Sequence, residues 1–227
     1  MIAKDSELRE LYETPAYGVV EAAKYLRVPY QTLRYWLTGF HRIPPLIQMA
    51  QEDPPRLSFL NVLECHMLSA MRSVYNLRVP RVRRALVSLK KHFPSRHPLI
   101  DRVFQTDGVH VFTEEFGRLI VLSQDGQFAM KSVLELHLQR IECDPTGLFR
   151  FFPFVMTRRP DEPKSILIDP LVGFGKPVIA GTAISTSVIA TRFKARESIR
   201  ELGEEYGRPE REIEEAIRWE EATELAA

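Results

Sequence analysis

One short stretch of the 227-residue sequence gathers four side chains that suit contacts with DNA. They are Tyr30, Gln31, Arg34 and Tyr35. A glutamine amide can form paired hydrogen bonds with an adenine edge, and an arginine guanidinium can pair with guanine or with phosphate. Tyrosine hydroxyls suit phosphate contacts, which position a protein on the duplex. We therefore expect this stretch to bind double-stranded DNA.

The apolar residues around this stretch predict two helices that meet at a turn. Ala23 is small enough for a close helix crossing, and Leu26 is an apolar anchor before the turn. Leu33 and Trp36 stand one turn apart, so they would bury one face of the second helix and direct the four DNA-contacting side chains outward. Gly39 is suited to end that helix, because glycine readily adopts the left-handed conformation of a C-cap.

The residues that follow predict a short two-stranded wing. Apolar segments at 45–49 and 56–59 flank the turn-like string QEDPP at 51–55. Arg42 and Arg56 stand beside these segments, and we expect both to contact DNA together with the four residues above.

Charge is distributed unevenly along the chain. Residues 1–100 carry 15 Lys and Arg against 8 Asp and Glu, a net charge of +7 that favours a polyanion. Residues 101–160 have a net charge of −1 and residues 161–227 a net charge of −5. A helix expected at 80–92 presents a polar stripe with two readings, a row of phosphate contacts or a plain solvated face. The stripe consists of Arg81, Arg84, Ser88 and Lys91.

The first 90 residues resemble the MerR-type winged helix-turn-helix. The string TLRYW at 32–36 stands in the predicted second helix, where that family carries TLRYW or TLRYY. The resemblance implies DNA binding by this helix and its wing. Arg27 occupies the turn position where the family usually has glycine, and a non-glycine residue with positive φ is strained there. Pro29 stands where a Ser or Thr N-cap is usual, and the long dimerising coiled coil of many MerR regulators is not visible.

The C-terminal residues predict a β-hairpin followed by three helices. A strand, a glycine-rich turn and a second strand fit residues 166–186, and helical spacing marks 186–195, 198–206 and 210–222. The string GFGKP in the turn does not match a phosphate-binding loop, which needs GxxxxGK[ST] at the start of a helix. Here Pro177 follows the lysine.

This region resembles the "domain of unknown function four-three-three" family, most specifically through GKPVIAGT at 175–182. That family pairs such a hairpin with a small homeodomain-like helical bundle. Ala183 stands where an arginine commonly follows the threonine. The domain is common in antitoxins of type II toxin–antitoxin modules, so the whole chain resembles a VapB-type antitoxin.

The resemblance implies two partners. One is a PIN-like ribonuclease toxin, which the antitoxin binds and neutralises, and the other is the operator DNA through which it represses its own operon. Four basic residues are candidates for toxin binding, because a PIN-like active site clusters carboxylates. They are Lys176, Arg192, Lys194 and Arg196. The alternative for each of them is a solvated residue on an amphipathic helix pair. We also expect a homodimer, since helix-turn-helix proteins usually bind two half-sites.

No catalytic constellation is apparent. The six histidines are scattered, and no HExxH, GxSxG or paired-carboxylate pattern occurs. Cys65 and Cys143 lack the spacing of a disulfide framework or a zinc site. The sequence has no apolar run of about 20 residues and no signal-peptide core. We therefore expect a soluble cytoplasmic protein that is not an enzyme and has no metal or cofactor.

The middle segment leaves a second function open. We expect strands that turn at Gly117 and at Asp125–Gly126, followed by a helix near 130–142. Seven phenylalanines in this part of the chain could line a ligand pocket, which would make the protein a ligand-responsive MerR-like regulator, or they could form core. They are Phe112, Phe116, Phe128, Phe149, Phe151, Phe152 and Phe154.

Together these patterns predict a mainly α fold with small β elements. Its parts would be an N-terminal winged helix-turn-helix at 1–97, a middle α+β segment at 98–160, and a C-terminal β-hairpin with a three-helix homeodomain-like bundle at 165–227.

Overall fold

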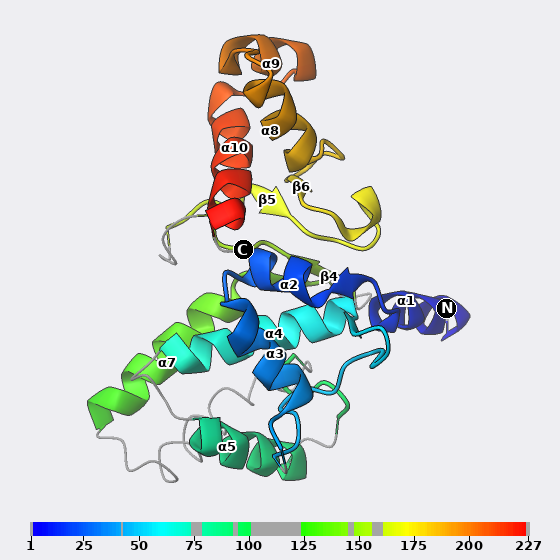
Figure 1. Ribbon diagram of the computed structural model, residues 1–227, viewed down its shortest axis with the longest axis vertical. Coiled ribbons are helices and arrows are strands. Elements are labelled where there is room, and N and C mark those ends of the chain that lie inside the picture. The colour runs from blue at the N-terminus through cyan, green and yellow to red at the C-terminus, as the bar shows by residue number, and fades with distance from the viewer. Residues whose placement is uncertain are drawn as a thin grey trace. The chain divides into compact units, whose positions relative to one another are not determined.

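The computed structural model shows a mainly helical chain with three small antiparallel strand pairs, which confirms the expected class (Figure 1). The structure describes residues 2–41, 43–73, 79–92, 95–100, 124–144, 148–155 and 161–225. The chain forms two compact units. The central unit comprises residues 13–22 and 30–139, and the C-terminal unit comprises residues 1–12, 23–29 and 140–227. The division into domains at 1–97, 98–160 and 165–227 stays a prediction.

The central unit is built around one fully buried helix. Its elements are β1 (Tyr17–Gly18), the first turn of α2 (Val19–Leu26), α3 (Tyr30–Thr38), β2 (Arg56–Leu57), α4 (Phe59–Ser73), α5 (Val79–His92) and α7 (Gln124–Leu138). Every described side chain of α4 is buried, and α4 lies beside α7 (Figure 1). The buried residues of α4 include polar ones, among them Asn61, Glu64 and His66, and each of these three has a hydrogen-bond partner, as burial of polar groups requires.

Asn61 fixes the start of α4. The N–H of Ser58 donates to Oδ1 of Asn61 over 3.2 Å, and the N–H of Asn61 donates to Oγ of Ser58 over 3.2 Å. This reciprocal arrangement satisfies two backbone donors that a helix start leaves without partners. The Asn61 amide also accepts from the N–H of Ala50 and donates to the carbonyl of Gln48. It therefore holds the segment before β2 against α4.

The wing differs from the expectation. Residues 45–49 form no strand, and β2 pairs instead with β1, with Tyr17 opposite Leu57. Gln51 and Arg56 exchange two backbone hydrogen bonds across QEDPP, so the turn itself is present. The partner strand is upstream because the buried Tyr17 and Leu57 bring these two segments together. The winged helix-turn-helix arrangement as a whole stays a prediction.

The expected turn at Asp125–Gly126 is wrong, because both residues lie inside α7. The helix begins at Gln124, six residues earlier than expected, and ends at Leu138. Met130 and Leu134 are fully buried one turn apart, and packing of this face stabilises the helix. An aspartate is also favourable in the first turn of a helix. The expected strands with a turn at Gly117 lie outside the described residues.

The C-terminal unit contains the end of α2, nearly all of α1 (Ile2–Glu13) and the elements after residue 140. These later elements are β3 (Ile141–Cys143), β4 (Phe149–Phe151), β5 (Ile166–Leu167), η2 (Gly173–Gly175), β6 (Val178–Ile179), α8 (Thr186–Lys194), α9 (Ile199–Tyr206) and α10 (Glu210–Leu225). β3 pairs with β4, and β5 pairs with β6. A bridge between Phe151 and Ile168 continues from β4 to the end of β5. The expected hairpin followed by three helices is thus found.

Local signals explain the three helices. Ser198 and Glu201 form a complete capping box at the start of α9, and Gly207 ends it with a left-handed φ of 61°. α10 lies against both α8 and α9 (Figure 1). Its buried face includes Ile213 and Trp219, both with no exposed surface. None of the helices that the structure describes combines the length and hydrophobicity of a membrane span.

Arg140 ties the strand pairs to the segment before β5. Its guanidinium donates hydrogen bonds to four backbone carbonyls, and its carbon lies 4.8 Å from the ring centroid of Phe154. The four carbonyls belong to Phe152, Pro153, Glu162 and Pro163. Arg140 is 3% exposed, and this burial lowers the pKa of its guanidinium.

Candidate functional site

The α3 helix turns its polar residues toward solvent. Leu33, Trp36 and Leu37 are buried, as their spacing requires. Gln31 and Arg34 are exposed, whereas Tyr30 and Tyr35 are partly exposed. The outward orientation matches the expectation from the sequence. Contact of these four side chains with DNA stays a prediction.

The turn before α3 carries the positive φ expected from the sequence. Arg27 has a φ of 51°, and the N–H of Val28 donates to the carbonyl of Ala23 over 3.1 Å. The Arg27 guanidinium carbon lies 5.5 Å from the ring centroid of Trp219 on α10, within the C-terminal unit. This cation–π contact with a buried indole helps to offset the strain of a non-glycine residue in that conformation.

Gly39 ends α3 as expected, with a φ of 70° and an N–H that donates to the carbonyl of Tyr35 over 3.0 Å. A Cβ at this position would lie 2.1 Å from the carbonyl oxygen of Ile43, so only glycine fits.

The other basic residues expected to contact DNA fall in different settings. Arg56 is exposed in β2, and its Nη1 donates to the carbonyl of Ala16 over 3.4 Å. Arg42 lies outside the described residues. On α5, Arg84 and Lys91 are exposed, while the Arg81 and Ser88 side chains lie outside the described set. Both readings of the α5 stripe stay open.

Four buried polar side chains form two close pairs in the central unit. Nδ1 of His97 lies 2.8 Å from Oε2 of Glu64. The rings of His66 and His137 lie 4.7 Å apart, and Nε2 of His66 lies 3.1 Å from the carbonyl oxygen of His137. No group of three or more metal-binding side chains occurs among the described residues. Sequence reasoning missed the Glu64–His97 pair because 33 residues separate the partners.

The two cysteines lie in contrasting environments. Cys65 has no exposed surface in α4, and desolvation by burial raises the pKa of its thiol well above the usual value. Cys143 in β3 is partly exposed. A thiol with a raised pKa is a poor nucleophile, so Cys65 is a structural residue.

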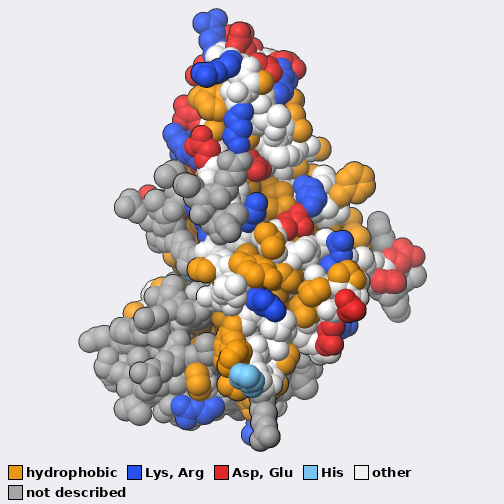
Figure 2. All heavy atoms as spheres, viewed as in Figure 1, with side chains coloured by type: hydrophobic (Ala, Val, Ile, Leu, Met, Phe, Trp, Pro, Cys, Tyr) orange, Lys and Arg blue, Asp and Glu red, His pale blue; other side chains and the backbone are white. Residues whose placement is uncertain are grey.

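Arg192, a candidate for toxin binding, is engaged inside the helical bundle. Its guanidinium contacts the carboxylates of Glu197 and Glu205, with Nη1 at 2.7 Å from Oε1 of Glu205, and it also donates to the Tyr206 hydroxyl over 3.0 Å. These bonds lower the pKa of the Glu205 carboxyl. The guanidinium therefore links the end of α8 to α9. Figure 2 shows basic and acidic side chains side by side over this bundle.

The other three candidates are exposed. Lys176 follows η2 in the β5–β6 loop, and Lys194 ends α8. Arg196 lies between α8 and α9 with a φ of 79°. Binding of a toxin by any of the four stays a prediction.

The β5–β6 loop also displays an aromatic side chain that sequence reasoning missed. Phe174 is 97% exposed and has a φ of 55°. Hydrophobic side chains project at the edge of the bundle beside this loop (Figure 2). The only sequence signal was a phenylalanine placed between two glycines. This signal does not predict exposure, because phenylalanine in a globular protein is usually interior.

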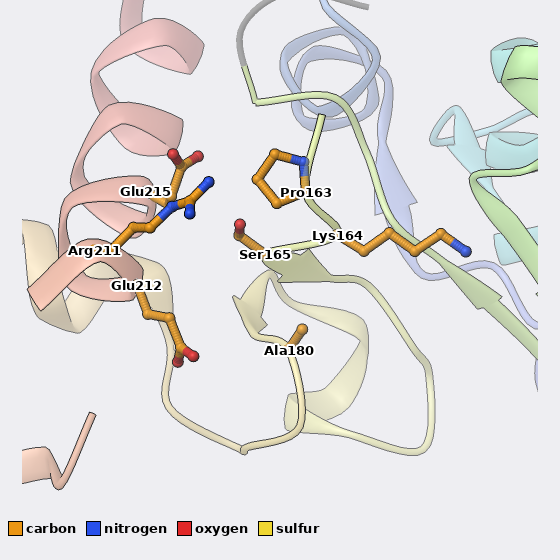
Figure 3. Close-up of a pocket in the computed structure, with 7 residues that line it drawn as sticks. All are labelled: Pro163, Lys164, Ser165, Ala180, Arg211, Glu212 and Glu215. Carbon is orange, nitrogen blue, oxygen red and sulfur yellow. The ribbon is translucent and has the colours of Figure 1, made fainter. Parts of the chain in front are cut away.

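A cavity of ≈380 Å³ lies between the segment before β5 and α10 (Figure 3). Its lining mixes polar and apolar surface, and Lys164 points away from it toward Glu142, with which it forms an ion pair at 2.6 Å. The lining residues are Pro163, Lys164, Ser165, Ala180, Arg211, Glu212 and Glu215. None is aromatic, so this cavity is not the ligand pocket considered from the sequence.

The hairpin and bundle match a known family. Residues 166–219 fit the family model "Protein of unknown function (DUF433)". The match covers β5 through most of α10 and includes the β5–β6 loop. It confirms the resemblance that GKPVIAGT suggested.

Relatives extend the likeness to the whole chain. "Putative antitoxin VapB45" of Mycobacterium tuberculosis is 27% identical over 95% of this chain and 98% of its own length. "Uncharacterized protein Rv2308" of the same organism is 24% identical over 94% of this chain and 93% of its own length. The expected resemblance to a VapB-type antitoxin is thereby confirmed.

A solved structure shares the fold. The crystal structure of Rv2018 from M. tuberculosis superposes with a TM-score of 0.69 at 22% identity, over 90% of this chain and 98% of that one.

Proposed function

We propose that this chain is an antitoxin that binds and neutralises a PIN-like ribonuclease toxin and represses its own operon by binding DNA. The observation that carries the proposal is the end-to-end likeness to "Putative antitoxin VapB45". A likeness over 95% of the chain covers the α3 region and the DUF433 segment together. In this proposal one polypeptide carries both activities, and it acts by binding and not by catalysis.

The α3 helix supports the DNA-binding half of the proposal. Gln31 and Arg34 are exposed on a helix whose opposite face is buried, which is the arrangement that base contacts in a major groove require. Such helices usually act in pairs, so we propose a homodimer that binds two half-sites about one DNA turn apart. The cytoplasm is the compartment in which both proposed partners occur.

The aromatic residues do not favour the alternative of a ligand-responsive regulator. Phe151 has no exposed surface, and Phe152 and Phe154 are 8% and 6% exposed. These three side chains pack in the interior of the C-terminal unit. Phe149 contacts Tyr12 edge-to-face at 6.1 Å. The remaining three of the seven phenylalanine side chains lie outside the described set.

Co-expression tests the toxin half of the proposal. The proposal predicts that a PIN-like protein is encoded beside this chain, that it arrests growth when expressed alone, and that co-expression of this chain restores growth and yields a complex that purifies as one species. Continued arrest, with no complex, would contradict the antitoxin role.

A footprint on the DNA upstream of the operon tests the second half. The chain should protect two half-sites there and leave a fragment of unrelated sequence and equal length unprotected at the same salt concentration. Equal binding to both fragments would contradict the role as operon repressor.

A further inference from the structure

The β5–β6 loop holds one aromatic ring in solvent on a well-ordered backbone. The N–H groups of Val172 and Gly175 donate to the carbonyls of Asp169 and Val172 over 2.9 and 3.1 Å. The N–H of Leu171 donates to Oδ1 of Asp169 over 2.9 Å. Asp169 is 4% exposed and lies 3.7 Å from Arg150. These contacts fix the loop before any partner arrives, which reduces the entropy lost on binding.

Phe174 has a left-handed backbone conformation, which is strained for a non-glycine residue and which a glycine at this position would adopt without strain. A φ of 55° and a ψ of 35° place it in the left-handed region, which costs a non-glycine residue of the order of 1 kcal/mol. The flanking Gly173 and Gly175 also have positive φ. Glycine would fit this conformation without strain, and a phenylalanine that is 97% exposed gains almost nothing from burial. We therefore expect the ring to contact another molecule.

The surroundings of the ring indicate the chemistry of the partner. Leu171, in the same loop, is 50% exposed, and Lys176 is exposed two residues beyond Phe174. The β5–β6 loop contains one basic residue, Lys176, and one acidic residue, Asp169, whose buried carboxylate lies beside Arg150. An apolar tip with an exposed lysine beside it complements an apolar pocket with carboxylates at its rim.

We propose that the β5–β6 loop is the docking element for the toxin and that Phe174 is its anchor, seated in an apolar pocket of the toxin whose rim carries carboxylates. The inference rests on the proposed antitoxin function and names its contact. Lys176 lies at the edge of this contact and pairs with the carboxylate rim. A protein is favoured over DNA as the partner of this loop, because Lys176 is its single basic residue and DNA binding depends on several phosphate contacts.

Phe174→Asn tests the anchor without disturbing the loop. Asparagine tolerates the left-handed conformation better than other non-glycine residues, so the variant keeps the turn and removes only the ring. Phe40→Asn is the matched control, since Phe40 is 59% exposed in the central unit. Affinity for the purified PIN-like protein encoded beside this chain is measured by titration calorimetry at fixed salt, with full-length chains throughout.

We expect Phe174→Asn to raise the Kd at least about thirtyfold, as loss of an interface anchor does, and Phe40→Asn to leave it unchanged. Lys176→Glu should weaken the complex and reduce its salt dependence. Equal affinity of the wild type and Phe174→Asn overturns the docking proposal while the antitoxin function stands. No binding by the wild type overturns both. If Phe174→Asn instead changes the oligomeric state of the chain alone, the loop joins two copies, and the toxin-docking proposal is wrong.

Discussion

Replacing Arg140 with methionine should destabilise the C-terminal unit severely, because one guanidinium satisfies four backbone carbonyls. Methionine keeps an apolar stem of similar length but donates no hydrogen bond. The carbonyls of Phe152 and Pro153 accept at 2.6 and 3.1 Å in fully buried surroundings. Those of Glu162 and Pro163 accept at 2.8 and 3.1 Å in partly buried surroundings.

The expected loss of unfolding free energy depends on which of the four carbonyls are buried and which are only partly buried. Water can replace the guanidinium at the two partly buried carbonyls, so those bonds cost little. The two buried carbonyls lose their partner, and each unsatisfied buried group costs about 1–3 kcal/mol. We therefore expect Arg140→Met to lower the free energy of unfolding by about 2–6 kcal/mol. Arg200→Met is the control, because Arg200 is 76% exposed and its ion pair with Glu204 contributes only about 0.3–0.5 kcal/mol.

The position of the two tryptophans makes the assay specific. Trp36 belongs to the central unit and Trp219 to the C-terminal unit, and the sequence contains no other. In a Trp36→Phe background, fluorescence during urea unfolding reports on Trp219 alone. The comparison is made between variants within that background, so any effect of Trp36→Phe cancels. A loss of less than about 1 kcal/mol for Arg140→Met relative to Arg200→Met would refute the reasoning, since the four bonds would then not matter in the folded state.

Three further predictions concern DNA binding, a helix cap and an ion-pair cluster. Arg34→Ala should weaken operator binding by about 1–3 kcal/mol in gel-shift titrations, and an affinity equal to that of Arg200→Ala would remove Arg34 from the interface. Ser198→Ala should lower the free energy of unfolding by roughly 1 kcal/mol in thermal melts, because it removes the N-cap of α9, and an unchanged Tm would mean that the cap is dispensable. Arg192 lowers the pKa of Glu205 below 4.5, so its stabilisation is present above that pH and is lost as the pH falls through the lowered pKa. The difference in Tm between the wild type and Arg192→Met should therefore shrink in acid, and a constant difference from pH 7 to pH 3 would contradict this assignment.

The helices could be predicted from the sequence wherever an apolar stripe coincided with a clear start or stop. The stripe of Leu33 and Trp36 ending at Gly39 is one case, and the capped α9 is another. The prediction failed at Asp125–Gly126, where a strong local turn signal lies inside a helix. The burial of Met130 and Leu134 stabilises α7, and this packing is tertiary information that the local string does not contain.

Some features of the candidate site could likewise be predicted from the local sequence, and others depend on tertiary contacts. The exposure of Gln31 and Arg34 follows from helical periodicity alone. The engagement of Arg192 does not, because its partners lie 5 and 13 residues away and meet it only through the bend between α8 and α9. Phe174 could not be predicted as exposed, since its position depends on three successive left-handed residues.

Because Cys65 is buried and Cys143 is partly exposed, the reaction of the two thiols with a reagent can report on unfolding of the central unit. Cys143 is the partly exposed one of the two cysteines, so we expect a maleimide dye to attach once to the folded protein, in β3 of the C-terminal unit. Cys65 becomes reactive only when α4 leaves the core of the central unit. The fraction of molecules that carry two dyes, measured by mass spectrometry, therefore gives the fraction in which the core of the central unit has unfolded. The dye on Cys143 of the folded protein is also a fluorescent label in the unit that contains the β5–β6 loop.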